Sequence, residues 1–174
     1  MLAFGLINPF FGILFKFAVK KGKSRDIWII DIDNTIADTV YSYQTNHNSN
    51  FERLRSLKVL KGSQKLITEL ENTTVIYLTA RNYIYYPITQ SWLKEHGFLK
   101  SNLNLIMVQT PSQKIPYLKK IASEYNVTFI DDLSFNQENG STEMYSDVIK
   151  EVKKLPIIYH DYLYIGSLNS PYND

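Results

Sequence analysis

Four short apolar runs, each followed at once by polar residues, constrain the fold of this chain more than any other feature. They occupy residues 26–31, 74–79, 103–108 and 127–131. The first run is rich in isoleucine and does not alternate with polar residues, which indicates a strand buried on both faces. Residues 63–71, 87–96 and 112–125 carry apolar side chains at helical spacing. Strands that alternate with helices predict an α/β fold with a parallel sheet and helices on both faces.

The composition narrows the class of protein but names no partner. The 174 residues fit one domain with a real hydrophobic core, and 44% hydrophobic residues are typical of a folded chain. A net charge of +2 is too small to indicate a nucleic-acid-binding surface. Because the chain has no cysteine, a disulfide framework, a thiolate zinc site and a cysteine nucleophile are excluded. This fits a reducing compartment, and we expect a cytoplasmic location.

Residues 2–19 form an apolar run that Asn8 and Pro9 interrupt and that lysines follow. Charges after the run, rather than before it, argue against a secretory signal, and the interruptions make a spanning helix marginal. Asn8 as N-cap and Pro9 at the first helical position predict a helix over residues 9–21. This helix is expected either to pack on the domain or on a second subunit of an oligomer, or to make peripheral membrane contact through residues 2–21.

Two acidic clusters follow strands that are predicted to be neighbours. Asp31 and Asp33 end the first run, and Asp131 and Asp132 end the fourth. Ionised carboxylates at the end of a buried strand are costly unless a cation or hydrogen bonds compensate them. One alternative is that the first pair caps a following helix. Since strand ends meet at one edge of a parallel sheet, both clusters together predict a site for Mg²⁺, which prefers oxygen ligands.

Residues 29–38, IIDIDNTIAD, resemble the first motif of the haloacid dehalogenase superfamily. The other motifs of the family have counterparts in the same order: residues 75–79, which end in Thr79, then Lys114, then residues 129–132 with the paired aspartates. The resemblance covers roughly residues 27–132. It implies a three-layer Rossmann-like core over residues 24–174, with residues 1–23 as an N-terminal apolar helical segment. The intervals between the motifs are too short for a large cap, since domains below ~40 residues rarely fold alone.

The resemblance implies a Mg²⁺-dependent phosphatase that hydrolyses a phosphomonoester. Asp31 would be the nucleophile that forms an aspartyl-phosphate. Asp33 would be the acid and base, and both residues would contribute to the metal site, Asp33 through its backbone carbonyl. Asp132 is the preferred metal ligand of the second pair. Asp131 would bind the metal through water or orient its neighbour.

Three further residues are implied to contact the phosphate or its substrate. Thr79 would donate a hydrogen bond to the phosphoryl group, and Lys114 would neutralise charge on the nucleophile and the phosphoryl oxygens. Ser112 as N-cap would place Lys114 in the first turn of the third helix. Arg81 would bind an anionic group of the substrate. The alternatives are a strand-end threonine bonded to backbone, a solvated lysine and a structural arginine ion pair.

The substrate is the least constrained part of the prediction. Residues 78–81 (LTAR) and 89–93 (TQSWL) are most similar to the 5′-nucleotidase and polynucleotide-phosphatase branches, which favours a nucleotide or a nucleic-acid end. Tyr83, Tyr85 and Tyr86 would stack on a base or else pack at the start of a helix. Residues 41–50 are expected to form a loop near the site. A phosphotransferase, or a membrane-associated or scaffolding protein with the same fold, is an alternative.

Overall fold

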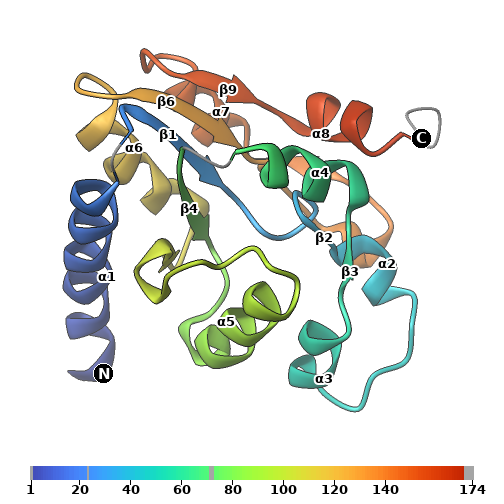
Figure 1. The fold of residues 1–174 in the computed structure, drawn as a ribbon. Coiled ribbons are helices and arrows are strands. Elements are labelled where there is room, and N and C mark those ends of the chain that lie inside the picture. Colours follow the sequence, from blue (N-terminus) through green and yellow to red (C-terminus); the bar gives the residue numbers. More distant parts are fainter. Residues whose placement is uncertain (1, 23, 71–72, 171–174) are drawn as a thin grey trace.

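A five-stranded parallel sheet forms the centre of the protein, in the order β5-β4-β1-β6-β9 (Figure 1). The computed structural model describes residues 2–22, 24–70 and 73–170. The strands of the sheet are β1 (Asp26–Ile30), β4 (Thr74–Thr79), β5 (Leu105–Met107), β6 (Asn126–Ile130) and β9 (Ile158–His160). The predicted α/β class with a parallel sheet is confirmed, and the topology is compatible with a Rossmann-like fold.

Helices flank this sheet, and two small ladders lie outside it. The α-helices are α1 (Leu2–Lys21), α2 (Thr39–Tyr43), α3 (Asn50–Arg55), α4 (Lys61–Glu69), α5 (Tyr86–Glu95), α6 (Ile115–Ile121), α7 (Ser146–Val152) and α8 (Tyr162–Leu168). The 3₁₀ turns are Tyr83–Tyr85, Asn102–Asn104, Pro111–Lys114 and Gln137–Asn139. The antiparallel ladders pair β2 (Ala37–Asp38) with β3 (Lys58–Val59), and β7 (Ser134–Phe135) with β8 (Glu143–Met144).

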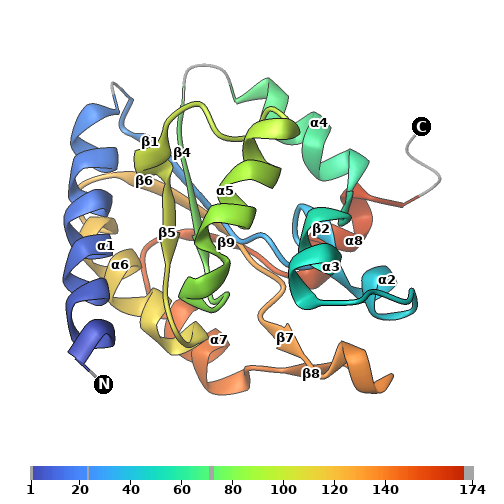
Figure 2. The ribbon, with the colours of Figure 1, turned by 90° about the horizontal axis from the view of Figure 1, so that it is seen from below.

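The side chains of the central strands alternate between two hydrophobic clusters, one on each face of the sheet. In β1, Ile27 and Ile29 point to the cluster that α1, α6 and α7 complete, while Ile30 points to the cluster that α5 and α3 complete. This alternation follows from the two-residue repeat of a strand. The views agree in placing α1 and α6 side by side, with α5 on the other side of the sheet (Figures 1 and 2). Both faces of the sheet are therefore covered.

Helix α1 packs on the sheet through one side. The residues Phe11, Phe15, Ala18 and Val19 are buried in the cluster with β1 and β4. Phe15 meets Tyr117 of α6 edge to face, with ring centroids 4.9 Å apart. The structure thus shows one of the predicted alternatives for residues 2–21, because part of the helix surface packs on the domain. Within the described part of the chain, no helix combines the length and the apolar character that crossing a membrane requires.

The start of α1 was predicted wrongly. The helix begins at Leu2 instead of Pro9, so that Asn8 and Pro9 lie inside it. Residues 2–7 include alanine and leucine, which favour helix. Pro9 removes one backbone donor of the helix, and the helix nevertheless extends on both sides of it.

Two other local predictions also need correction. Residues 41–50 are not wholly a loop, because α2 extends to Tyr43 and α3 begins at Asn50. Asp38 accepts a hydrogen bond from the Tyr41 amide and Ser49 accepts one from the Glu52 amide, so both short helices have side-chain caps. Ser112 is not an N-cap. It lies inside the 3₁₀ turn Pro111–Lys114, and α6 follows only from Ile115.

Candidate metal centre and active site

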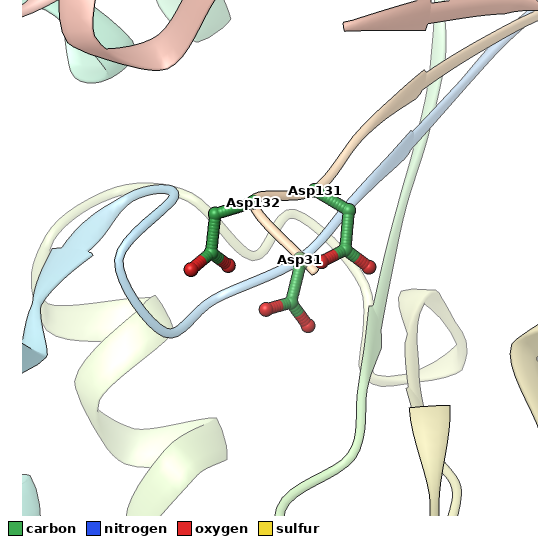
Figure 3. A group of neighbouring side chains, drawn as sticks. All are labelled: Asp31, Asp131 and Asp132. Atoms are coloured by element: carbon green, nitrogen blue, oxygen red, sulfur yellow. The ribbon is translucent and has the colours of Figure 1, made fainter. Parts of the chain in front are cut away.

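The ends of β1 and β6 bring three carboxylates together. Asp31 follows β1 and Asp131 and Asp132 follow β6, the strand that pairs with β1 in parallel. All three residues are buried, and one carboxylate oxygen from each lies within 4.8 Å of the others. Figure 3 shows the three side chains converging from the two chain segments. The predicted convergence of two acidic clusters therefore holds for these three residues.

Lys114 forms ion pairs with one carboxylate from the end of each of these two strands. Its Nζ donates hydrogen bonds to Oδ1 of Asp31 at 2.7 Å and to Oδ2 of Asp131 at 2.6 Å. The lysine is only 2% exposed, so the alternative of a solvated surface lysine is wrong. Burial by itself disfavours its charge, but Asp131 and Asp31 outweigh this and raise the pKa of Lys114 above its ordinary value. Lys114 is therefore a fixed cation at the centre of the cluster.

One ammonium cannot balance three carboxylates. Burial is the largest influence on Asp31 and raises its pKa well above the ordinary value, against the opposing effect of Lys114. Burial and the neighbouring Asp131 raise the pKa of Asp132 to about 7. These shifts reflect an excess of negative charge, because Lys114 is the only ammonium bonded to the three carboxylates among the described residues. The donor set fits a hard dication such as Mg²⁺, which would neutralise both charges with oxygen ligands.

The turn after β6 holds the paired aspartates in place. Oδ1 of Asp131 accepts a hydrogen bond from the Leu133 amide at 2.9 Å, and Asp132 accepts one from the Ser134 hydroxyl. Leu133 adopts a left-handed conformation with φ of 44°, which costs a non-glycine residue about 1–2 kcal/mol. The backbone strain is thus stored directly beside the carboxylates that it positions.

Asp33 stands apart from the carboxylate cluster. Its two oxygens bind Nε and one terminal nitrogen of Arg81, both at 2.8 Å, and the Thr39 hydroxyl donates a third hydrogen bond at 2.8 Å. Burial opposes the ionisation of Asp33 most strongly, but Arg81 and Thr39 outweigh it and lower the pKa of this carboxyl. The ion-pair alternative for Arg81 is therefore present in this structure. The guanidinium also donates to the Thr89 hydroxyl at 3.3 Å.

Thr79 ends β4, beside the nucleophile candidate at the end of β1. The side chain is buried, and its Oγ1 accepts a long hydrogen bond of 3.4 Å from the Arg81 amide. This contact leaves the hydroxyl hydrogen available to a phosphoryl oxygen. Thr35 is also buried, and its amide donates to the Ile32 carbonyl in the turn after Asp31.

The site has a cavity of about 260 Å³, lined by the three clustered carboxylates, Asp33, Thr79, Arg81 and Lys114. Other residues that the sequence did not point to also line it. Helices α2 and α3 contribute Tyr43 and Arg53, and the 3₁₀ turn before α5 contributes Tyr85. The guanidinium of Arg53 lies 4.3 Å from the centre of the Tyr43 ring and donates to the Ser42 hydroxyl at 3.1 Å. No carboxylate of the described residues pairs with Arg53 in the structure. The charge of Arg53 also contributes to the lowered pKa of Asp33. An arginine at the wall of this cavity is suited to bind a substrate anion.

The three tyrosines before α5 have different environments. Tyr83 is buried and stacks on Phe11 of α1 with ring centroids 5.5 Å apart, and Tyr86 lies 5.7 Å from the same ring. The packing alternative is therefore the correct one for these two. Tyr85 is half-buried, lines the cavity and meets Phe51 edge to face at 5.1 Å.

No model of a known protein family matches the chain, and no curated protein matches it significantly.

Proposed function

We propose that the protein is a Mg²⁺-dependent phosphomonoester hydrolase of the haloacid dehalogenase type. The observation that carries the proposal is the cluster of Asp31, Asp131 and Asp132, buried at the ends of adjacent parallel strands with Lys114 as the only ammonium bonded to it among the described residues. Buried carboxylates with too little positive charge destabilise the folded state. A bound dication would offset this destabilisation and supply a partner for phosphate oxygens.

The metal would be held by the carboxylates of Asp31 and Asp132, with Asp131 acting directly or through water and the Asp33 backbone carbonyl as a further ligand. When bound, Mg²⁺ supplies positive charge that stabilises the negative phosphoryl group in the transition state. Lys114 contributes to the same effect from the protein side. Its contact with Asp31 also fixes the orientation of that carboxylate.

Asp31 would attack phosphorus through a carboxylate oxygen, forming a P–O bond to Asp31 while the P–O bond to the alcohol breaks. The alcohol leaves with a proton from Asp33. Water then attacks the aspartyl-phosphate, Asp33 takes the proton of that water, and the P–O bond to Asp31 breaks to release phosphate. Thr79 would donate a hydrogen bond to the phosphoryl group in both steps.

The ion pair between Arg81 and Asp33 adds a condition to this sequence. As paired, Asp33 is ionised and ready to accept a proton, whereas its role as the acid requires that it hold one. We propose that Arg81 exchanges Asp33 for an anionic group of the substrate, which allows the pKa of Asp33 to rise. Arg81 would then fulfil its expected substrate-binding role, and the exchange would couple substrate binding to protonation of the acid.

For the substrate, we propose a phosphomonoester whose alcohol carries an aromatic base, such as a nucleotide or a nucleic-acid end. Arg53, Tyr43 and Tyr85 support this, because a guanidinium and two aromatic rings suit an anionic group and a base. A cytoplasmic nucleotide pool would provide such molecules.

The test is a phosphate-release assay over nucleotides, 3′- and 5′-phosphorylated oligonucleotides, sugar phosphates and a generic aryl phosphate, with Mg²⁺ or with a chelator. We expect release that requires Mg²⁺ and is greatest for nucleotides or oligonucleotide ends. Release that is unaffected by chelation would contradict the proposal. Transfer of phosphate to an added alcohol instead of water would indicate a phosphotransferase, and robust turnover of either kind would rule out a purely scaffolding role.

A further inference from the structure

Helix α1 carries a second apolar surface, opposite to the side that packs on the sheet. Phe10, Ile13 and Phe17 are 53%, 53% and 57% exposed. Their spacing places them along one stripe of the helix. The buried residues of the same helix, including Phe11 and Phe15, lie on the other side. A helix that only covered the sheet would expose polar residues here, so this stripe is unexplained by the fold.

Lysines accompany the apolar stripe. Lys16, Lys20 and Lys21 are all exposed. Helical geometry places Lys20 in line with the stripe, with Lys16 on one flank and Lys21 on the other. The helix contains no acidic residue. Exposed phenylalanines flanked by lysines are the arrangement of helices that lie in a membrane interface, where apolar side chains enter the acyl boundary and lysines meet lipid headgroups.

We propose that this face, defined by Phe10, Ile13, Phe17 and the three lysines, binds the surface of an anionic membrane. A second copy of the chain is the competing occupant. It would bring the same acid-free helix face and would leave the lysines without partners, whereas anionic headgroups pair with them. Helix α1 lies at the outer edge of the molecule in both views (Figures 1 and 2), and the apolar residues of this face are exposed. The helix would lie on the membrane surface, in keeping with the finding that no helix of the described residues is long and apolar enough to cross one.

The test measures binding of the full chain to sedimented vesicles of phosphatidylcholine alone and of phosphatidylcholine with phosphatidylserine. Three lysines near an anionic surface predict a preference for phosphatidylserine of about a hundredfold, which added salt should reduce. A chain that binds neither type of vesicle would overturn the proposal.

An apolar triple variant, Phe10→Ser with Ile13→Ser and Phe17→Ser, should weaken binding to both types of vesicle by at least about tenfold. The matched control changes exposed apolar residues elsewhere, Ile84→Ser and Leu163→Ser, which are 54% and 64% exposed. The control should bind as the unaltered chain does. Equal loss in the control and the triple variant would overturn the assignment to α1.

A charge variant, Lys16→Gln with Lys20→Gln and Lys21→Gln, should lose the preference for phosphatidylserine and keep weak binding to phosphatidylcholine. Exposed lysines elsewhere provide its control, Lys94→Gln in α5 with Lys153→Gln at the C-cap of α7. A preference that survives in the charge variant would contradict the proposal.

Sedimentation velocity without lipid tests whether a second copy of the chain, instead of a membrane, covers this face. We expect a monomer whose sedimentation the apolar triple variant leaves unchanged. A dimer that this variant dissociates would assign the face to a second copy and overturn membrane binding. Circular dichroism checks that each variant keeps its helices.

Discussion

The cavity contains two groups of charged side chains, one around the half-buried Asp33 and one around three buried carboxylates, and their charges are balanced in different ways. Asp33 has its own guanidinium, bound at both oxygens by Arg81, and its pKa is lowered. Asp31 and Asp132 share too little positive charge, and their pKa values are raised. The first group is complete within the protein. The second has less positive than negative charge among the described residues, and that difference supports the proposed metal centre.

The largest effect is expected from Asp31→Asn, which removes the proposed nucleophile and one metal ligand. Phosphate release should fall on the order of 10⁴-fold, because no other group can form the covalent intermediate. Steady-state kinetics with Mg²⁺ measures this. The control is Asp26→Asn at the exposed opposite end of the same strand, β1, which should leave turnover unchanged. Turnover that survives Asp31→Asn would remove the proposed mechanism.

Opposite changes in stability should distinguish the two groups in metal-free protein. Asp33→Asn leaves the buried Arg81 without its counter-ion and should lower the free energy of unfolding by about 3 kcal/mol. Asp132→Asn removes a carboxylate that has no cationic partner and should raise it by about 1 kcal/mol. Urea denaturation with a chelator present measures both. If the two substitutions change stability in the same direction, the proposed difference in charge balance between Asp33 and the carboxylate cluster is wrong.

The pH dependence of Mg²⁺ binding tests the raised pKa of Asp132. Its folded pKa of about 7 lies above the ordinary 3.8, so the proton on Asp132 stabilises the folded state fully below about pH 4, and this contribution is lost as the pH rises through 7. A cation competes with that proton. Mg²⁺ affinity should therefore rise by at least about tenfold for each pH unit as the pH approaches 7, because a proton on Asp31 competes with the cation as well. Calorimetric titration at several pH values would expose a flat profile, which contradicts the assignment.

The smallest effect is expected at the wall of the cavity. Arg53→Gln should raise KM about fivefold to tenfold for substrates with a second anionic group and change kcat less, since the arginine is proposed to bind the leaving group. Arg55→Gln is the matched control, because Arg55 is exposed on the same helix. An equal loss for substrates with and without the second anion would place Arg53 on the transferring phosphoryl group instead.

The strands and the carboxylate cluster could be predicted because their signals are local. A continuous apolar run indicates a buried strand, and Asp31, Asp131 and Asp132 follow such runs directly. The partnership of Asp33 with Arg81 could not be assigned, since 48 positions separate them and an ion pair or a substrate contact were equally open. Arg53 and Tyr43 were missed because α2 and α3 are too short to show helical periodicity.

The most direct test of the account is to identify the residue that carries the phosphate during turnover. Protein mixed with substrate and Mg²⁺ would be treated with borohydride, which reduces an acyl phosphate to an alcohol, and its peptides analysed by mass spectrometry. The account predicts reduction at Asp31 alone, dependent on both substrate and Mg²⁺. Reduction at Asp33, Asp131 or Asp132, or turnover without any reduced aspartate, would contradict it.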